Sequence, residues 1–412
     1  MTQGISFLHA ADLHLDSPFT GLAQVPELLF NDIRKSTFVA LDNLIQAAID
    51  KNVDFVLITG DLFDNEKQSL KAQIRLRDAF LKLEEYCIDV YISYGNHDYV
   101  KGNIHPLTYP DNVFEFTDET ISHFTYEKNG QTLAAIYGFS YENRVVDTNK
   151  AKEYEVVDKH IPYHIAMLHG SVSSNTEHDH YAPFHLTDLT HNEFDYWALG
   201  HIHKRQVLHT DPYIVYPGNI QGRNRKETGE KGCFHVSLSQ EGTSVSFVSL
   251  EAIQYQAMTL DVSNCTEIHQ LEQHLQHAIK TSFQESTPYL IDLHLTGETP
   301  ELMAWETEKY VAEIIELMNE SMAQRSHWRF IFRYSIAHQG YATEKDLKHG
   351  EHFMGELIRH FDEVSIHPFL TDLYQHRDFR KYITTLSERE EELIMDDAKQ
   401  LLINELLKTG GK

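Results

Sequence analysis

Short apolar runs and amphipathic stretches alternate along the first hundred residues. Consecutive apolar residues predict buried strands, whereas apolar positions spaced three and four apart predict helices. The expected order is strand, helix, strand, helix, strand, at residues 5–10, 31–51, 53–59, 66–86 and 88–93. Strands that alternate with helices predict an α/β sheet in which neighbouring strands are parallel.

Helical periodicity becomes scarce after residue 132, although strand-like apolar runs continue. These runs cover residues 132–137, 164–168, 194–199, 213–216, 233–238 and 245–250. We expect them to form a second, largely antiparallel sheet. Two sheets packed face to face with helices outside make a four-layer α/β/β/α sandwich, and this is the fold class predicted for residues 1–252.

The pattern changes near residue 252. Residues 253–340 are expected to form a compact βαβαβ unit, with strands at 257–262, 289–295 and 328–334 and helices at 266–283 and 300–323. Residues 341–412 are helical in pattern and strongly charged, with two apolar stripes at helical spacing. The prediction is a smaller α/β capping domain followed by a helical C-terminal segment. The apolar stripes suit packing on the rest of the chain or on a partner helix.

The charge, the cysteines and the absence of long apolar runs argue against several classes of protein. The formal net charge of −27 over 412 residues opposes general coating of a phosphate backbone, although bound divalent cations can reverse the charge of a site. The three cysteines are far apart and predict neither a disulfide framework nor a cysteine zinc site. No signal peptide and no apolar run of ~20 residues is recognisable, so we expect a cytoplasmic protein without membrane contact.

Polar residues capable of binding metals follow five of the predicted strands, where open α/β sheets place their ligand sites. Seven of them are the expected metal ligands: Asp12, His14, Asp61, Asn96, His169, His201 and His203. In an extended chain, residues two apart point the same way, so the Asp-x-His and His-x-His pairs should each aim together. A ligand set of carboxylates, imidazoles and one amide, with no thiolate, suits Mn²⁺, Fe²⁺ or Zn²⁺ better than Mg²⁺.

Seven protein ligands are too many for one such ion, so two ions are the simpler interpretation. Asp61 is the natural bridging carboxylate, because it is a lone aspartate after a glycine. Two ions can clamp the oxygens of an in-line phosphoryl displacement. His97 is then left beside the metals as the catalytic residue, either protonating the leaving oxygen or stabilising developing charge.

The ordered set Asp-x-His, Gly-Asp-x-x-Asp, Gly-Asn-His-Asp, His-Gly and Gly-His-x-His resembles the calcineurin-like metallophosphoesterase superfamily. Within it, roughly the first 250 residues resemble the DNA-repair exonuclease branch of SbcD-type nuclease subunits. Residues 197–204 and 216–223 are similar to a short bacterial, YhaO-like subgroup.

The resemblance implies roles for individual residues. One metal would be held by Asp12, His14, Asp61 and His203, and the other by Asp61, Asn96, His169 and His201. It also implies that Asp98 orients His97. Some family nucleases have a histidine near the substrate at the position of Asp64, but this chain has an aspartate, as other bacterial members do, so only a supporting role is expected for it. The resemblance further implies manganese, DNA as substrate, a homodimer, and an SMC-like (SbcC-type) ATPase subunit bound by the helical C-terminal segment.

Other functions stay open at this point. One is a phosphodiesterase or phosphatase acting on nucleotides or small phosphate esters, which would not require the unit after residue 252. Another is a binding module without catalysis, against which the intact His97 and ligand set argue.

Two further groups of residues surround the motifs. The loop of residues 171–185 is expected to lie over the site, but its His178, His180 and His185 receive no ligand role. A locally basic stretch is either ordinary surface charge or a contact for the phosphodiester backbone; it contains Lys204, Arg205, Arg223, Arg225, Lys226 and Lys231, with only Asp211, Glu227 and Glu230 as acids.

Overall fold

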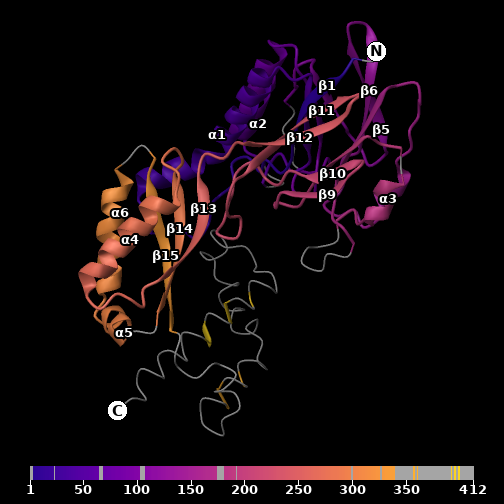
Figure 1. The fold of residues 1–412 in the computed structure, drawn as a ribbon. Helices are drawn as coiled ribbons and strands as arrows, with labels where there is room; N and C mark the ends of the chain where they lie inside the picture. Colours follow the sequence, from indigo (N-terminus) through magenta and orange to yellow (C-terminus); the bar gives the residue numbers. More distant parts are fainter. Residues whose placement is uncertain are drawn as a thin grey trace. The chain divides into compact units, whose positions relative to one another are not determined.

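Two six-stranded sheets, with strands drawn from residues 5–249, form the centre of the larger part of this computed structural model (Figure 1). The structure describes residues 3–22, 24–64, 68–102, 107–173, 181–191, 193–297, 300–324 and 327–338, with a few single residues beyond 355. Residues 1–336 and 337–412 form separate compact units. The expected helical segment of residues 341–412 falls almost entirely outside the described residues.

The first sheet has the strand order β12-β11-β1-β2-β3-β4. Its parallel strands are β1 (Ile5–Ala10), β2 (Phe55–Thr59), β3 (Asp89–Ser93) and β4 (Val113–Glu115). The remaining two, β11 (Gly232–Ser239) and β12 (Gly242–Ser249), are antiparallel. We expected them in the second sheet, which is wrong, because β11 pairs directly with β1 and brings Val236 opposite Phe7.

The second sheet has the order β5-β6-β7-β8-β10-β9. These strands are β5 (Ser122–Lys128), β6 (Gln131–Gly138), β7 (Tyr163–His169), β8 (Tyr196–Gly200), β9 (Gln206–Thr210) and β10 (Tyr213–Tyr216). The expectation of a largely antiparallel sheet is wrong, since β6, β7, β8 and β10 are parallel neighbours. In the described parts of the crossovers after β6 and β7, the helices are the short η1 (Lys150–Glu153) and α3 (Leu186–Thr190), which leave little helical periodicity in the sequence.

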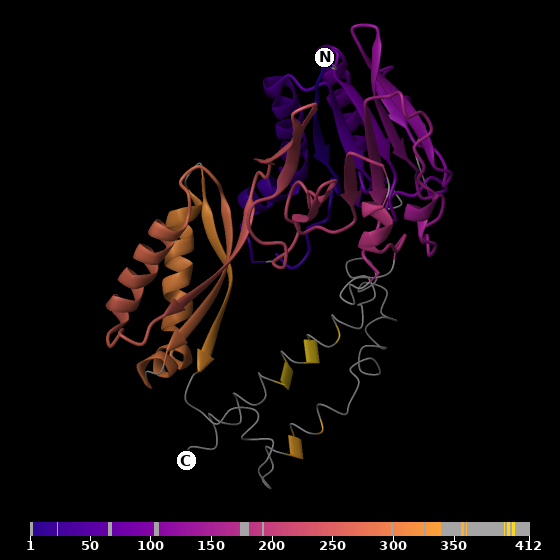
Figure 2. The ribbon, with the colours of Figure 1, turned by 45° about the vertical axis from the view of Figure 1, so that its right-hand side comes forward.

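Three apolar layers hold the sandwich together. Helices α1 (Glu27–Lys51) and α2 (Leu70–Glu84) pack on one face of the first sheet, against side chains such as Val56 and Ile58. The facing sides of the two sheets form a second cluster, and the outer face of the second sheet packs on α3, η1 and loops. The predicted four-layer α/β/β/α class is confirmed (Figure 2).

A separate three-stranded sheet follows, in the order β13-β14-β15. Its strands are β13 (Gln254–Asp261), β14 (Tyr289–Gly297) and β15 (Arg329–His338), and helices α4 (Ile268–Ser282), α5 (Pro300–Thr307) and α6 (Tyr310–Ala323) accompany them. The one helix expected at 300–323 is two, because Lys309 adopts a left-handed conformation with φ 65°. The domain boundaries at residues 252 and 340 stay predictions.

A buried arginine joins β15 to the end of α4. The Arg329 guanidinium donates hydrogen bonds to the backbone carbonyls of Ile279 (3.0 Å), Phe283 (3.0 Å) and Gln284 (3.3 Å). Carbonyls at a helix C-terminus have no intrahelical partner, so this side chain satisfies groups that would otherwise be buried without one.

Replacing Arg329 with methionine is therefore expected to lower the free energy of unfolding of this sheet by about 2–3 kcal/mol. Urea unfolding followed by circular dichroism measures the change. The matched control is Arg77→Met on α2, because the guanidinium of Arg77 is partly exposed and pairs with its neighbour Asp78 at 2.8 Å. Equal losses in the free energy of unfolding of the two variants would contradict the role of Arg329 in satisfying the carbonyls at the end of α4.

Candidate metal centre

The predicted ligands lie at the carboxyl ends of parallel strands from both sheets. Three groups follow strands of the first sheet: Asp12 and His14 after β1, Asp61 after β2, and Asn96 with His97 after β3. His169 ends β7 of the second sheet, and His201 and His203 follow β8. Contacts between these side chains bring all seven predicted ligands and His97 into one cluster.

The backbone of the cluster is unusual. Asp12, His14, Asp61 and His201 have φ values of 52°, 42°, 51° and 96°, in the region that residues with a side chain rarely adopt. The expectation that Asp12 and His14 lie in extended chain is therefore wrong. Conformations of this kind cost free energy and cluster at functional sites, so four of them among the predicted ligands favour a functional role.

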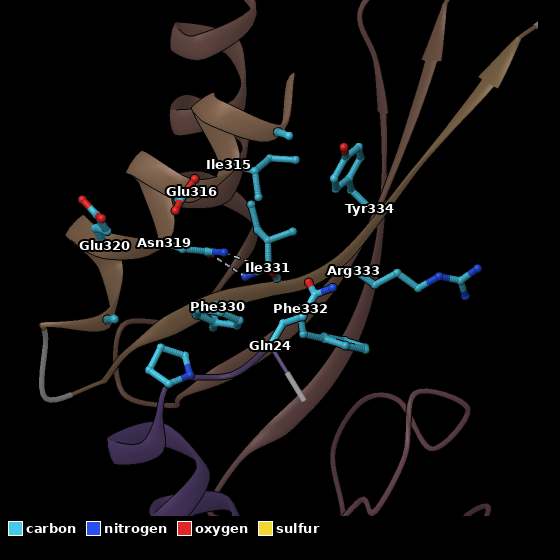
Figure 3. A pocket seen from close by; sticks show the side chains of 13 residues that line it. Gln24, Ile315, Glu316, Asn319, Glu320, Phe330, Ile331, Phe332, Arg333 and Tyr334 are labelled. Atoms are coloured by element: carbon cyan, nitrogen blue, oxygen red, sulfur yellow. Dashed lines mark hydrogen bonds between the residues drawn. The ribbon is translucent and has the colours of Figure 1, made fainter. Parts of the chain in front are cut away.

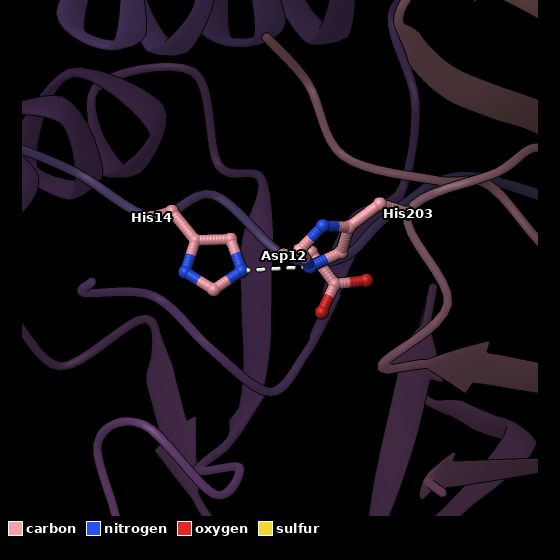
Figure 4. A group of neighbouring side chains, drawn as sticks. All are labelled: Asp12, His14 and His203. Atoms are coloured by element: carbon pink, nitrogen blue, oxygen red, sulfur yellow. Dashed lines mark hydrogen bonds between the residues drawn. The ribbon is translucent and has the colours of Figure 1, made fainter. Parts of the chain in front are cut away.

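His14, which follows β1 of the first sheet, faces His203, which follows β8 of the second, and Asp12 lies beside them (Figure 4). Their Nε2 atoms are 3.0 Å apart. Burial lowers the pKa of both imidazoles, so both are neutral at physiological pH. At this distance one of the two Nε2 atoms can donate its proton to the other, or, with both lone pairs free, the two atoms can bind one cation.

A second pair of imidazoles surrounds Asn96. Its Oδ1 atom is 3.1 Å from His169 Nε2 and 3.2 Å from His201 Nδ1. The Nδ1 atom of His169 lies 3.1 Å from the backbone carbonyl oxygen of Thr59, which makes Nδ1 the protonated nitrogen and directs the Nε2 lone pair into the cluster. The hydroxyl of Tyr141 donates to the carbonyl of His169 at 3.0 Å and holds the backbone in place.

Asp61 lies between the two pairs. Its Oδ2 atom is 3.7 Å from His14 Nε2 and 3.5 Å from His169 Nε2, and its Oδ1 atom accepts a hydrogen bond of 3.0 Å from the backbone of His97. A Cβ atom on Gly95 would come within 2.3 Å of Asp61 Oδ1 and 2.7 Å of His169 Nε2. The glycine before Asn96 therefore keeps this space open.

The carboxylates of Asp12 and Asp61 are both buried in this cluster. Burial and the neighbouring carboxylate of Asp61 raise the pKa of Asp12, whereas for Asp61 the effect of burial is outweighed by His169 and His97, which lower its pKa. Groups of carboxylates and imidazoles here have potential ligand atoms within 4.8 Å of one another. Carboxylate, amide and neutral imidazole donors in this arrangement fit divalent cations.

His97 lies at the edge of the cluster and is partly exposed. Its Nδ1 atom is 2.9 Å from the backbone carbonyl oxygen of Asp64, so Nε2 is the nitrogen that can exchange a proton with a substrate. The role expected for Asp98, that of orienting His97, stays a prediction. The Asp98 carboxylate accepts hydrogen bonds of 2.7 Å from the backbone N–H groups of both Gly95 and Leu62, and so joins the loops after β2 and β3.

Comparison with known proteins identifies the family. The calcineurin-like phosphoesterase family matches residues 5–205. An uncharacterized metallophosphoesterase of Bacillus subtilis (strain 168), YhaO, is 36% identical over 407 residues, covering 98% of this chain and 99% of that protein. The chain belongs to the calcineurin-like metallophosphoesterases. The predicted family and the prediction of a hydrolase acting on phosphoester bonds are confirmed.

More distant relatives of this metallophosphoesterase carry other names. The DNA double-strand break repair protein Mre11 of Methanocaldococcus jannaschii is 28% identical over 250 residues, covering 58% of this chain and 64% of that protein. Among solved structures, a dimetal phosphatase from Danio rerio aligns with a TM-score of 0.38 and 12% identity, over 60% of this chain and 99% of that one.

Two residues after β10 touch the metallophosphoesterase centre and had no assigned role at it. The Glu227 carboxylate is 2.9 Å from His203 Nδ1, and the Arg223 guanidinium forms an ion pair with Asp64. Arg223 was expected only as one of several basic residues, and Glu227 only as one of few acids. Their spacing of four residues in a segment rich in glycine gave no sign of these contacts.

The other basic residues of this stretch differ in their surroundings. The Lys231 ammonium group is largely buried and donates to the carbonyl of His203 at 3.1 Å. The Arg205 guanidinium stacks on the Phe247 ring, 3.7 Å from the ring centroid. Ordinary surface charge therefore does not describe the whole stretch. Of the loop histidines, His178 and His180 lie outside the described residues, and His185 is the N-cap of α3.

A hollow of about 580 Å³ lies elsewhere, between α6, β15 and the segment before α1 (Figure 3). Its lining includes Ile315, Phe330 and Glu316 and none of the predicted ligands.

Within the part of the chain that the structure describes, no helix has the length and apolar character needed to cross a membrane.

Proposed function

We propose that this metallophosphoesterase is a two-metal phosphodiesterase that cleaves DNA. The observation that carries the proposal is the position of Asp61 Oδ2, within 3.7 Å of His14 and 3.5 Å of His169. One carboxylate oxygen close to both imidazoles suits a bridge between two ions. The ions would be held in two sets that share this bridge: Asp12, His14, Asp61 and His203, and Asp61, Asn96, His169 and His201.

The family resemblance implies manganese, and iron or zinc would also suit these ligands. When bound, the two ions supply Lewis-acid activation of the phosphate and of the attacking water. The protein's own contribution to the chemistry comes from His97. Its Nδ1 donates to the carbonyl of Asp64, so in the imidazolium form the second proton is on Nε2, which gives it to the leaving oxygen as the phosphodiester bond breaks.

Arg223 supports a phosphate ester as the substrate. Its guanidinium lies beside His203 and Asp64, and its buried Nε has no hydrogen-bond partner among the described residues. A planar guanidinium binds phosphate oxygens through two parallel hydrogen bonds. We infer that Arg223 binds a non-bridging oxygen of the substrate phosphate.

DNA is favoured as the substrate over nucleotides and small esters by two considerations. Relatives similar over more than half of the chain are named as DNA double-strand break repair proteins. The sheet of β13, β14 and β15 adds a surface that a small ester does not need. From the family resemblance we further propose a homodimer and an SMC-like ATPase partner bound through residues 341–412.

The test is cleavage by purified, metal-analysed protein in Mn²⁺, with and without the ATPase partner. We expect cleavage of linear and hairpin DNA as well as hydrolysis of bis-p-nitrophenyl phosphate. Hydrolysis of the small ester with both DNA substrates left intact, even with the partner, would contradict the nuclease assignment and favour the small phosphate esters. Loss of both activities on EDTA treatment, restored by Mn²⁺, is the expected metal control.

A further inference from the structure

Glu227 contacts a predicted metal ligand through one carboxylate oxygen and the neighbouring loop through the other. One carboxylate oxygen, Oε1, lies 2.9 Å from His203 Nδ1. The other, Oε2, accepts hydrogen bonds from the side-chain amide of Asn219 (2.8 Å) and from the backbone N–H of Arg223 (2.7 Å). Only 11% of the Glu227 side chain is exposed, so these protein groups are its main partners.

The contact between Glu227 and His203 fixes which nitrogen of the imidazole carries the proton. A carboxylate can only accept, so Nδ1 of His203 must carry the proton and Nε2 must carry the lone pair. The Nε2 atom is the one that lies 3.0 Å from His14 Nε2, inside the cluster of potential ligands. A carboxylate behind a metal-binding histidine raises the basicity of the ring and holds its orientation.

The same carboxylate also connects His203 to Arg223. The backbone N–H of Glu227 donates to the carbonyl of Asn224 at 3.0 Å, which closes a turn that carries Arg223 back toward the cluster. Lys231 adds a second support, since its ammonium group donates to the backbone carbonyl of His203. The ring of His203 and the backbone of Arg223 therefore share one anchor.

We infer that Glu227 is a positioning residue, which sets the tautomer and direction of His203 for metal binding and ties that ligand to the loop carrying Arg223. The inference rests on the proposed function in one respect, that His203 is a ligand. A glutamine at this position would keep the shape, but its amide nitrogen would face a donor. The charge, and not only the volume, of Glu227 is therefore required.

The test measures Mn²⁺ affinity by isothermal titration calorimetry, without any substrate. We expect two bound ions in the unaltered protein, and a loss of about 10–100-fold in affinity for one of them in Glu227→Gln. The matched control is Glu230→Gln, because this glutamate lies in the same loop, is half-exposed and pairs with Arg205 at 3.6 Å. Its metal affinity should equal that of the unaltered protein.

A double-mutant cycle separates action through His203 from a general effect on the loop. In a His203→Ala background, Glu227→Gln should cause no further loss of affinity. Additive losses would overturn the inference, and so would unchanged affinity in Glu227→Gln alone. If the glutamine variant fails to fold, Glu227→Asp keeps the charge at a greater distance and enters the same cycle. Absence of Mn²⁺ binding by the unaltered protein would instead contradict the proposed function.

Discussion

Replacing Asp61 with asparagine is expected to remove both metal ions and to lower phosphodiester hydrolysis by about 10³-fold or more, equivalent to ~4 kcal/mol of activation free energy. The substitution keeps the shape of the side chain but removes the charge of a carboxylate whose Oδ2 atom lies close to both His14 and His169. Every other predicted ligand belongs to one of the two sets, so no other single substitution should affect both ions equally.

Metal content by elemental analysis and turnover of bis-p-nitrophenyl phosphate give the two measurements. Asp78→Asn is a suitable control, because Asp78 is an exposed aspartate that pairs with the adjacent Arg77. Two retained ions together with normal turnover in the Asp61 variant would contradict the bridging role. Loss of one ion alone would show that Asp61 serves a single metal.

Substituting His97 with alanine should have the opposite signature, with metals retained and turnover lost. General acid catalysis typically contributes 10²–10⁴-fold, so we expect a fall of about that size in kcat on DNA. The His97 side chain is oriented by the carbonyl of Asp64 and is absent from both proposed ligand sets. The Mn²⁺ stoichiometry of the variant should therefore stay at two.

The leaving group separates the two roles considered for His97. A p-nitrophenolate needs little protonation, so a general acid should matter much less for the p-nitrophenyl ester than for DNA. Equal losses on both substrates would favour stabilisation of charge on the phosphate instead. His160→Ala provides the control, since His160 is an exposed histidine outside the cluster. Unchanged rates in the His97 variant would remove its assigned role altogether.

The order of polar motifs along the chain predicted which side chains would meet. Each motif follows a strand, and strands that run parallel end at the same edge of a sheet, so Asp12, Asp61 and Asn96 had to lie near one another. The second sheet contributes His169 and His201 by the same rule. That these two edges face each other is a matter of sheet packing, which local sequence patterns do not record.

The failures of prediction have a common origin in long-range pairing. Periodicity located β11 and β12 as strands, but their sheet depends on a partner more than 220 residues away, at β1. The parallel order of β6, β7 and β8 was missed because the helices in the described parts of their crossovers are short. Glu227 was missed for a related reason, since it acts through His203, 24 residues earlier in the chain.

The pairing of β1 with β11 also limits how the protein can be divided. The family match ends at residue 205, before β9, β10, β11 and β12. A fragment cut there would leave the backbone of β1 as an open edge, which favours association between chains, and would discard Glu227 and Arg223. A piece meant for expression by itself therefore has to extend at least through Ser249 at the end of β12.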